Sequence, residues 1–269
     1  MFYALVLDAG SSGSRLRVFR WEEATDSQLP PIREISQDSA HARHQAECLR
    51  RRPGLSAFAR SPALAGKQVS DLVDCAARMV PEEFHKRTPL YVKATAGLRL
   101  VKPAMAEAVL EAVRGALAAG PFDFRGAQII SGEAEAIFGW LSVNHLHATL
   151  SAPPQAPSRV GWLDLGGASA QISFELPRDA TVGAGDEAFV EELALPSGAT
   201  RVYRRSRLSY GREAAFKRTC RMLRDERLVA LERRRSRRRR AQAVDNPTGE
   251  GADGALAGGI VDGLSLIHI

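Results

Sequence analysis

The chain contains one short pattern twice, in the same register. Residues 7–16 and 163–172 each read as an apolar strand that ends at an aspartate, a turn of small residues, and a second apolar strand. Asp8 aligns with Asp164, and a glycine follows two residues after each. Each copy predicts a β-hairpin whose turn exposes successive backbone N–H groups able to bind phosphate oxygens. Each aspartate could hold a hydrated divalent cation, so two facing hairpins would form a clamp for a nucleotide polyphosphate and its metal.

Composition sets bounds on the remaining possibilities. The 269 residues allow one large or two modest domains, and 45% apolar residues support a real core. We find no run of 18 apolar residues and no signal-peptide pattern after Met1, so we expect no membrane segment in this chain.

The net charge of +6 comes from one segment, because the seven arginines within residues 233–240 alone carry more positive charge than that total. We therefore interpret this run as a solvated helix end and expect no nucleic acid partner. The three cysteines are far apart and suggest neither a disulfide framework nor a zinc site.

Hydrophobic periodicity predicts alternating strands and helices outside the two hairpins. The predicted helices span residues 64–79, 102–119, 133–150 and 210–235, and residues 40–52 lean towards helix. The further predicted strands span residues 89–94, 127–131, 191–195 and 200–207. Residues 151–158 are rich in proline and serine and are predicted to be a linker.

Two further segments place polar groups where a strand or helix begins or ends. Thr95 follows the strand 89–94 and could offer its hydroxyl to a phosphate or to an attacking water. Glu133 and Glu135 open a helix, and one of them could be a general base. Taken singly, a simple strand-to-helix connection and acids that complement a helix dipole explain these segments better. The two glutamates cannot share one task, because residues two apart on a helix point in different directions. Trp140 is predicted to be a packing residue.

Together these segments resemble the nucleoside triphosphate diphosphohydrolase (apyrase) family, within the actin-like ATPase superfamily. The four matching segments, in the family's order, are VLDAGSSGSRLRVFRW (6–21), YVKATAGLRL (91–100), IISGEAEAIFGWLSVN (129–144) and WLDLGGASAQISF (162–174). VYRRSRLSYGREAA (202–215) resembles the strand-to-helix segment that follows in the family. The resemblance implies an α/β chain with an RNase H-like, actin-like ATPase fold, the first lobe complete and the second partial.

The resemblance also implies roles at the matching positions. Asp8 and Asp164 would hold Mg²⁺ or Ca²⁺ through water, and Glu135 would be the catalytic base, from its place five residues before Trp140. The implied phosphate-binding residues are Ser11, Ser12, Gly13, Gly167, Ala168 and Ser169. The residues that would position the terminal phosphate and the attacking water are Thr95, Ser169 and Gln171. The implied reaction is direct attack of water on the terminal phosphorus of a nucleoside di- or triphosphate, which depends on positioning and charge stabilisation.

Departures from the family pattern lead us to expect a partial apyrase. The family usually has Gln-Glu-Glu-Gly where this chain has residues 133–136, Glu-Ala-Glu-Ala, and the resemblance fades after Leu223. We expect four regions: a first lobe (1–150), the linker (151–158), the start of a second lobe (159–232) and a disordered or artefactual tail (233–269). The sequence itself does not determine the cellular compartment of the protein. The family resemblance suggests the secretory pathway, a membrane anchor or the extracellular space if a natural N-terminus lies upstream.

Two alternatives stay open at this point. The exopolyphosphatase and guanosine pentaphosphate phosphatase family shares the superfamily, and its third motif also resembles IISGEAEA, whereas ATAGLRL, FGW and DLGGASAQ favour apyrase. The other alternative is a non-catalytic fragment or pseudoenzyme that binds nucleotide, or an acidic partner through its arginine segment, because most of the second lobe is missing. The activity on ATP and ADP against that on polyphosphate would separate the two enzyme families.

Overall fold

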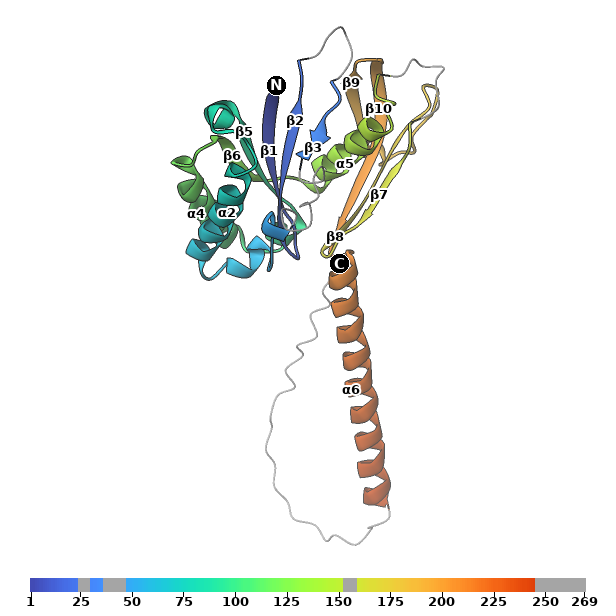
Figure 1. Ribbon diagram of the computed structural model, residues 1–269. Coiled ribbons are helices and arrows are strands. Elements are labelled where there is room, and N and C mark those ends of the chain that lie inside the picture. The colour runs from blue at the N-terminus through green and yellow to red at the C-terminus, as the bar shows by residue number, and fades with distance from the viewer. Residues whose placement is uncertain (24–29, 36–46, 152–158, 245–269) are drawn as a thin grey trace. The chain divides into compact units, whose positions relative to one another are not determined.

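The computed structural model describes residues 1–23, 30–35, 47–151 and 159–244, with side chains up to residue 237. By its internal contacts the chain divides into two units, residues 1–218 and residues 219–269. The first unit contains two sheets, each built on one of the repeated hairpins (Figure 1). The described part of the second unit is the continuation of a single helix, exposed from residue 219 to residue 237.

The first sheet grows from the first hairpin. Its strands are β1 (Phe2–Ala9), β2 (Ser14–Trp21), β3 (Arg33–Glu34), β4 (Arg50–Arg51), β5 (Pro89–Ala94) and β6 (Asp123–Ile129). Their order is β3-β2-β1-β5-β6, with β4 also pairing with β2. β1 runs antiparallel to β2 and parallel to β5, and β5 runs parallel to β6. Because parallel strands end at one edge, the residues after β1, β5 and β6 meet there.

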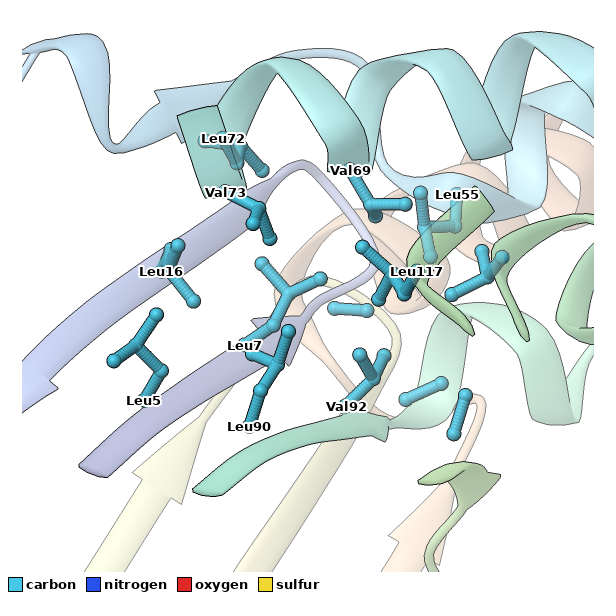
Figure 2. Packing of buried hydrophobic residues seen from close by; sticks show 14 of the residues in the cluster. Leu5, Leu7, Leu16, Leu55, Val69, Leu72, Val73, Leu90, Val92 and Leu117 are labelled. Atoms are coloured by element: carbon cyan, nitrogen blue, oxygen red, sulfur yellow. The ribbon is translucent and has the colours of Figure 1, made fainter. Parts of the chain in front are cut away.

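Helices α2 (Pro62–Ala77) and α4 (Pro103–Ala118) pack against each other beside this sheet (Figure 1). Each begins with a proline in its first turn, where a backbone N–H would have no hydrogen-bond partner within the helix, so its absence loses no hydrogen bond. Their apolar faces and the alternating apolar residues of β1, β2 and β5 form the main core (Figure 2). Figure 2 labels ten of the buried residues of this core: Leu5, Leu7, Leu16, Leu55, Val69, Leu72, Val73, Leu90, Val92 and Leu117.

The second sheet is antiparallel, in the order β7-β8-β10-β9. Its strands are β7 (Trp162–Leu165), β8 (Ser169–Glu175), β9 (Val190–Leu195) and β10 (Gly198–Leu208). Helix α5 (Gly132–Leu146) packs on β8 and β10, and Trp140 on this helix is fully buried beside Ile137. The prediction that Trp140 is a packing residue is confirmed. On the described residues β7 pairs with β8 alone, and Leu163 and Leu165 are 75% and 64% exposed.

The remaining elements are α3 (Ala96–Arg99), the 3₁₀ turns η2 (Leu55–Phe58), η3 (Glu82–Arg87) and η4 (Glu187–Phe189), and helix α6 (Arg212–Val244). The first residues of α6, up to Arg218, belong to the first unit. The predicted helix at 210–235 is confirmed and extends further, since Arg, Ala and Gln favour helix. None of the described helices is both long and apolar enough to cross a membrane.

The predicted hairpins, the strand at 89–94 and the helices at 64–79, 102–119 and 133–150 are confirmed with shifts at their ends. The helical tendency assigned to residues 40–52 is wrong at its end, where Arg50 and Arg51 form β4; residues 40–46 lie outside the described residues. Two causes act here. The backbone of β2 offers hydrogen bonds to β4, and Pro53 disfavours the helical conformation at the preceding residue. The tail from residue 245 also lies outside the described residues.

A disulfide joins Cys48 to Cys75, with their Cα atoms 6.1 Å apart. The expectation that the cysteines form no disulfide framework is therefore wrong for this pair, whose members are 27 positions apart in the sequence; the third cysteine, Cys220, is free. The fold brings them together, since β4 pairs with β2 and α2 packs beside both strands. The bond therefore fastens the segment that leads into β4 to helix α2.

Replacing both bridged cysteines by serine is expected to lower the free energy of unfolding by roughly 2–4 kcal/mol, because the open chain regains loop entropy. Urea denaturation of the C48S/C75S variant measures this loss. The matched control is Cys220→Ser, which removes an exposed thiol outside the bridge. Equal midpoints for the two variants would mean that the bridge contributes no stability.

Candidate active site

The two repeated turns lie directly opposite each other. A Cβ placed on Gly167 in the second turn would come within 2.6 Å of the Ser11 hydroxyl oxygen in the first. Asp8 lies in β1 and Asp164 in β7, one residue before the end of each strand, so both carboxylates reach the space beside the turns. The predicted facing arrangement of the hairpins is thus present in the fold.

A cavity of about 410 Å³ lies between the turns. The predicted site residues that line it are Asp8, Ser11, Ser12, Gly13, Thr95, Glu135, Asp164, Gly167, Ala168 and Ser169. Gln171 is not on the lining but donates hydrogen bonds to Glu135 and Ser169, which are. Every residue to which the family resemblance assigned a role is therefore brought to one place. Of the two glutamates at the start of α5, only Glu135 lines the cavity.

Three glycines that were not predicted to be site residues approach the backbone of the two turns closely. A Cβ on Gly54 would lie 2.4 Å from the carbonyl oxygen of Gly10, and one on Gly97 would lie 2.8 Å from the Cα of Ser11. A Cβ on Gly211 would lie 2.5 Å from the backbone nitrogens of Ala168 and Ser169. No side chain fits at these contacts, so glycine allows three separate segments to support the turn backbones.

The start of α6 also fixes the second turn through hydrogen bonds. The backbone N–H of Arg212 donates to the carbonyl oxygen of Gly166 at 2.9 Å, and that of Glu213 donates to the carbonyl oxygen of Gly167 at 3.0 Å. The backbone N–H of Ser209 donates to the carbonyl oxygen of Ala168 at 2.8 Å. These carbonyl groups are thereby occupied, and the turn is held in one conformation.

Four carboxyl groups line the cavity, those of Asp8, Glu135, Asp164 and Glu213, and their negative charges favour a bound cation. Burial raises the pKa of Asp8, Glu135 and Asp164, in each case as the largest cause. The negative charge of Asp164 raises the pKa of Asp8 further, while Arg15 and Arg17 lower it. A cation placed between the carboxylates would favour their ionised forms.

The carboxylates of Asp8 and Asp164 suit a divalent cation that keeps part of its water shell better than one bound by protein ligands alone. Over the described residues, no three His, Cys, Asp or Glu side chains come close enough together to hold a metal ion by themselves. Mg²⁺ commonly keeps several waters and is bound by one or two carboxylates together with substrate phosphates. Asp8 and Asp164, on opposite turns of one cavity, match that arrangement.

A hydrogen-bond network surrounds Glu135. Three acceptors lie within hydrogen-bond distance of the Gln171 amide nitrogen, which has two N–H groups to donate: the Glu135 Oε2 atom at 3.1 Å, the Ser169 hydroxyl at 2.6 Å and the Ser206 hydroxyl at 3.1 Å. The Gln171 Oε1 atom is buried and has no hydrogen-bond partner among the described residues. A buried acceptor without a protein partner is a place where an ordered water is expected.

Arginines line the cavity at positions that the sequence analysis did not identify. They are Arg15, Arg50, Arg51, Arg52 and Arg212. Three of them are consecutive, and they lie here because β4 pairs with β2 and the disulfide fastens the preceding segment. The run of three arginines was visible in the sequence, but only the strand pairing shows that it faces the turns. Such a cluster creates a positive potential that favours a polyphosphate.

Comparison with known proteins finds relatives that match most of this chain. Ectonucleoside triphosphate diphosphohydrolase 2 of Gallus gallus is 36% identical over 225 residues, which cover 80% of this chain and 43% of that protein. The Golgi apyrase of Schizosaccharomyces pombe is 36% identical over 209 residues, 73% of this chain and 35% of that protein. The chain thus spans less than half the length of these curated relatives.

The fold has a counterpart among solved structures. A nucleoside triphosphate hydrolase of Neospora caninum superposes with a TM-score of 0.55 at 18% sequence identity, over 78% of this chain and 45% of that one. The predicted α/β, actin-like fold is confirmed, and so is the resemblance to the apyrases. The family model described as GDA1/CD39 (nucleoside phosphatase) matches residues 1–233. The chain therefore belongs to the GDA1/CD39 nucleoside phosphatase family.

Proposed function

We propose that this chain hydrolyses the terminal phosphate of nucleoside tri- and diphosphates by direct attack of water, in the presence of Mg²⁺ or Ca²⁺. The observation that carries the proposal is the pair of facing turns around a cavity that also holds Asp8, Glu135 and Asp164. The family and the named activities of its curated relatives support it.

In this mechanism the protein holds the phosphates between two sets of turn residues. Ser11, Ser12 and Gly13 contact them from one side, and Gly167 and Ala168 contact them from the other through backbone N–H groups. The arginines around the cavity would add charge-assisted hydrogen bonds to phosphate oxygens. Such fixed donors favour the charge distribution of phosphoryl transfer without reorganising during the reaction.

The remaining residues act on the attacking water. Glu135 accepts its proton as the general base, and Ser169, Gln171 and Thr95 orient the water and the terminal phosphate. The unpartnered Gln171 Oε1 atom is a suitable acceptor for the water's second hydrogen. Asp8 and Asp164 would hold the hydrated cation, which when bound neutralises phosphate charge.

The decisive assay measures release of inorganic phosphate by the purified chain from ATP, ADP and inorganic polyphosphate. We expect release from the nucleotides with Mg²⁺ or Ca²⁺, a loss of more than about a hundredfold with EDTA, and recovery on adding the cation back. Asp8→Asn is expected to raise the cation concentration needed for half-maximal rate. Asp71→Asn is the matched control, because Asp71 is exposed on α2 and pairs with Lys67.

Each other outcome has a definite meaning. Hydrolysis that EDTA does not affect would remove Asp8 and Asp164 from their proposed role. Phosphate release from polyphosphate but not from nucleotides would favour the exopolyphosphatase alternative. Nucleotide binding in calorimetry without any turnover would support the binding fragment that does not hydrolyse.

We further propose that the protein acts in the secretory pathway or outside the cell. The Golgi apyrase and the ectonucleoside triphosphate diphosphohydrolases among its relatives support this. The Cys48–Cys75 disulfide supports it independently, because such bonds persist in oxidising compartments and are rare in the cytosol. Localisation of the endogenous protein by immunofluorescence tests the proposal, and a purely cytosolic signal would contradict it.

A further inference from the structure

Arg99 makes the shortest contact to the carboxylate of Glu135. Its Nη2 atom donates to the Glu135 Oε2 atom at 2.6 Å, and the two side chains are only 14% and 19% exposed. The same Nη2 atom lies 3.4 Å from the Ser169 hydroxyl, and Nη1 donates to the carbonyl oxygen of Ile130 at 3.3 Å. Arg99 thus connects α3 to the segment before α5 and to β8, and the planar fork of a guanidinium suits such a contact better than an ammonium does.

Among the described residues, every hydrogen bond to the Glu135 carboxylate falls on one oxygen. Oε2 accepts from Arg99 and, at 3.1 Å, from Gln171. Oε1 accepts no hydrogen bond from any residue that the structure describes. The carboxylate is therefore held by one oxygen, while the other is left for a partner that is not protein.

We propose that Arg99 is a positioning residue, which holds Glu135 through Oε2 so that Oε1 is the oxygen that takes the proton of the attacking water. The inference rests on the proposed function. In the step concerned, the water oxygen forms a bond to the terminal phosphorus while its proton passes to Oε1. The bond from that phosphorus to the bridging oxygen breaks, and its electron pair leaves with the nucleotide product.

The positive charge of Arg99 supports the same arrangement. Burial and the charges of Asp164 and Asp8 raise the pKa of Glu135, whereas the charge and the hydrogen bond of Arg99 lower it. Removing the guanidinium is thus expected to free the carboxylate to move and to raise its pKa further, because the two lowering influences of Arg99 are lost while burial and the charges of Asp164 and Asp8 remain.

The kinetic test compares Arg99→Met and Arg99→Lys with wild type. We expect kcat of R99M to fall on the order of a hundredfold, because a small misplacement of a reacting group has that effect. KM should change little, R99K should retain part of the activity, and millimolar guanidinium should restore part of the R99M rate. Arg125→Met is the matched control, because Arg125 pairs with Asp123 at an exposed place on β6. A wild-type kcat in R99M, or an effect on KM alone, would overturn the proposal.

A second measurement does not depend on turnover. Glutamate labelled with ¹³C at the side-chain carboxyl gives a Glu135 resonance, assigned by its absence in E135Q. Its titration without metal or nucleotide is expected to move to higher pH in R99M and to move less in R99K. If the wild-type chain shows no hydrolysis, the proposed function fails, yet this titration still reports whether Arg99 holds Glu135. The same titration curve in wild type and R99M would overturn the proposal whatever the activity.

Discussion

Glu135→Gln is expected to lower turnover at least about a hundredfold, because an amide cannot accept the proton of the attacking water. The size of the side chain is unchanged, so binding of nucleotide should persist. Steady-state phosphate release measures turnover, and calorimetry with a non-hydrolysable nucleotide measures binding. A variant that turns over at the wild-type rate would remove Glu135 from the role of base.

The pH dependence of the same variant provides an independent check. Burial raises the pKa of Glu135, so its carboxyl stays protonated, and unable to act as a base, to a higher pH than usual. The wild-type rate should therefore rise with pH through that pKa, and E135Q should lack this rise. Glu133→Gln is the matched control, since Glu133 opens the same helix and does not line the cavity. A loss of activity in E133Q with little change in E135Q would reverse the assignment.

Gly211→Ala is expected to damage the site without touching substrate. The new Cβ would lie 2.5 Å from the backbone nitrogens of Ala168 and Ser169, so the second turn must shift. Such overpacking typically costs about 1–3 kcal/mol of folding stability. A displacement of roughly 1 Å at a reacting centre lowers the rate on the order of a hundredfold.

The control for this substitution is Gly115→Ala on α4. A Cβ at Gly115 would meet nothing within 4 Å, and alanine in a helix is more stable than glycine by roughly 0.5–1 kcal/mol. We expect G115A to unfold at slightly higher denaturant and to keep the wild-type rate. Normal kinetics in G211A would mean that the second turn tolerates movement and that its support by α6 is unimportant.

The parts of the site that could be predicted from sequence are those carried by local pattern. The pattern of an aspartate before a turn of small residues predicts Asp8 and Asp164 as candidate site residues without any tertiary information, because hairpin geometry is set within about ten residues. Ser169 and Gln171 were assigned by the family resemblance and not by the local pattern. Thr95 was found from the local pattern, as the first residue after a strand.

The parts that could not be predicted depend on how distant segments approach. The proposed role of Arg99 requires α3 to lie beside α5 and β8, and nothing within residues 91–100 indicates that arrangement. Gly54 and Gly211 must be glycine because they approach the backbone of turns that are distant in the sequence. Which of Glu133 and Glu135 lines the cavity depends on the rotation of α5 about its axis, and the fold shows that it is Glu135, the residue to which the family resemblance assigned the role of base.

Strand β7 has a consequence for handling the protein in solution. It carries Asp164 into the site, yet among the described residues its second edge pairs with no other strand, and Leu163 and Leu165 are largely exposed. An open edge with apolar side chains is a template for strands of other molecules. Concentrated samples are therefore expected to self-associate beside Asp164, the carboxylate proposed to hold the cation, so activity assays should be compared only at matched, dilute protein concentrations.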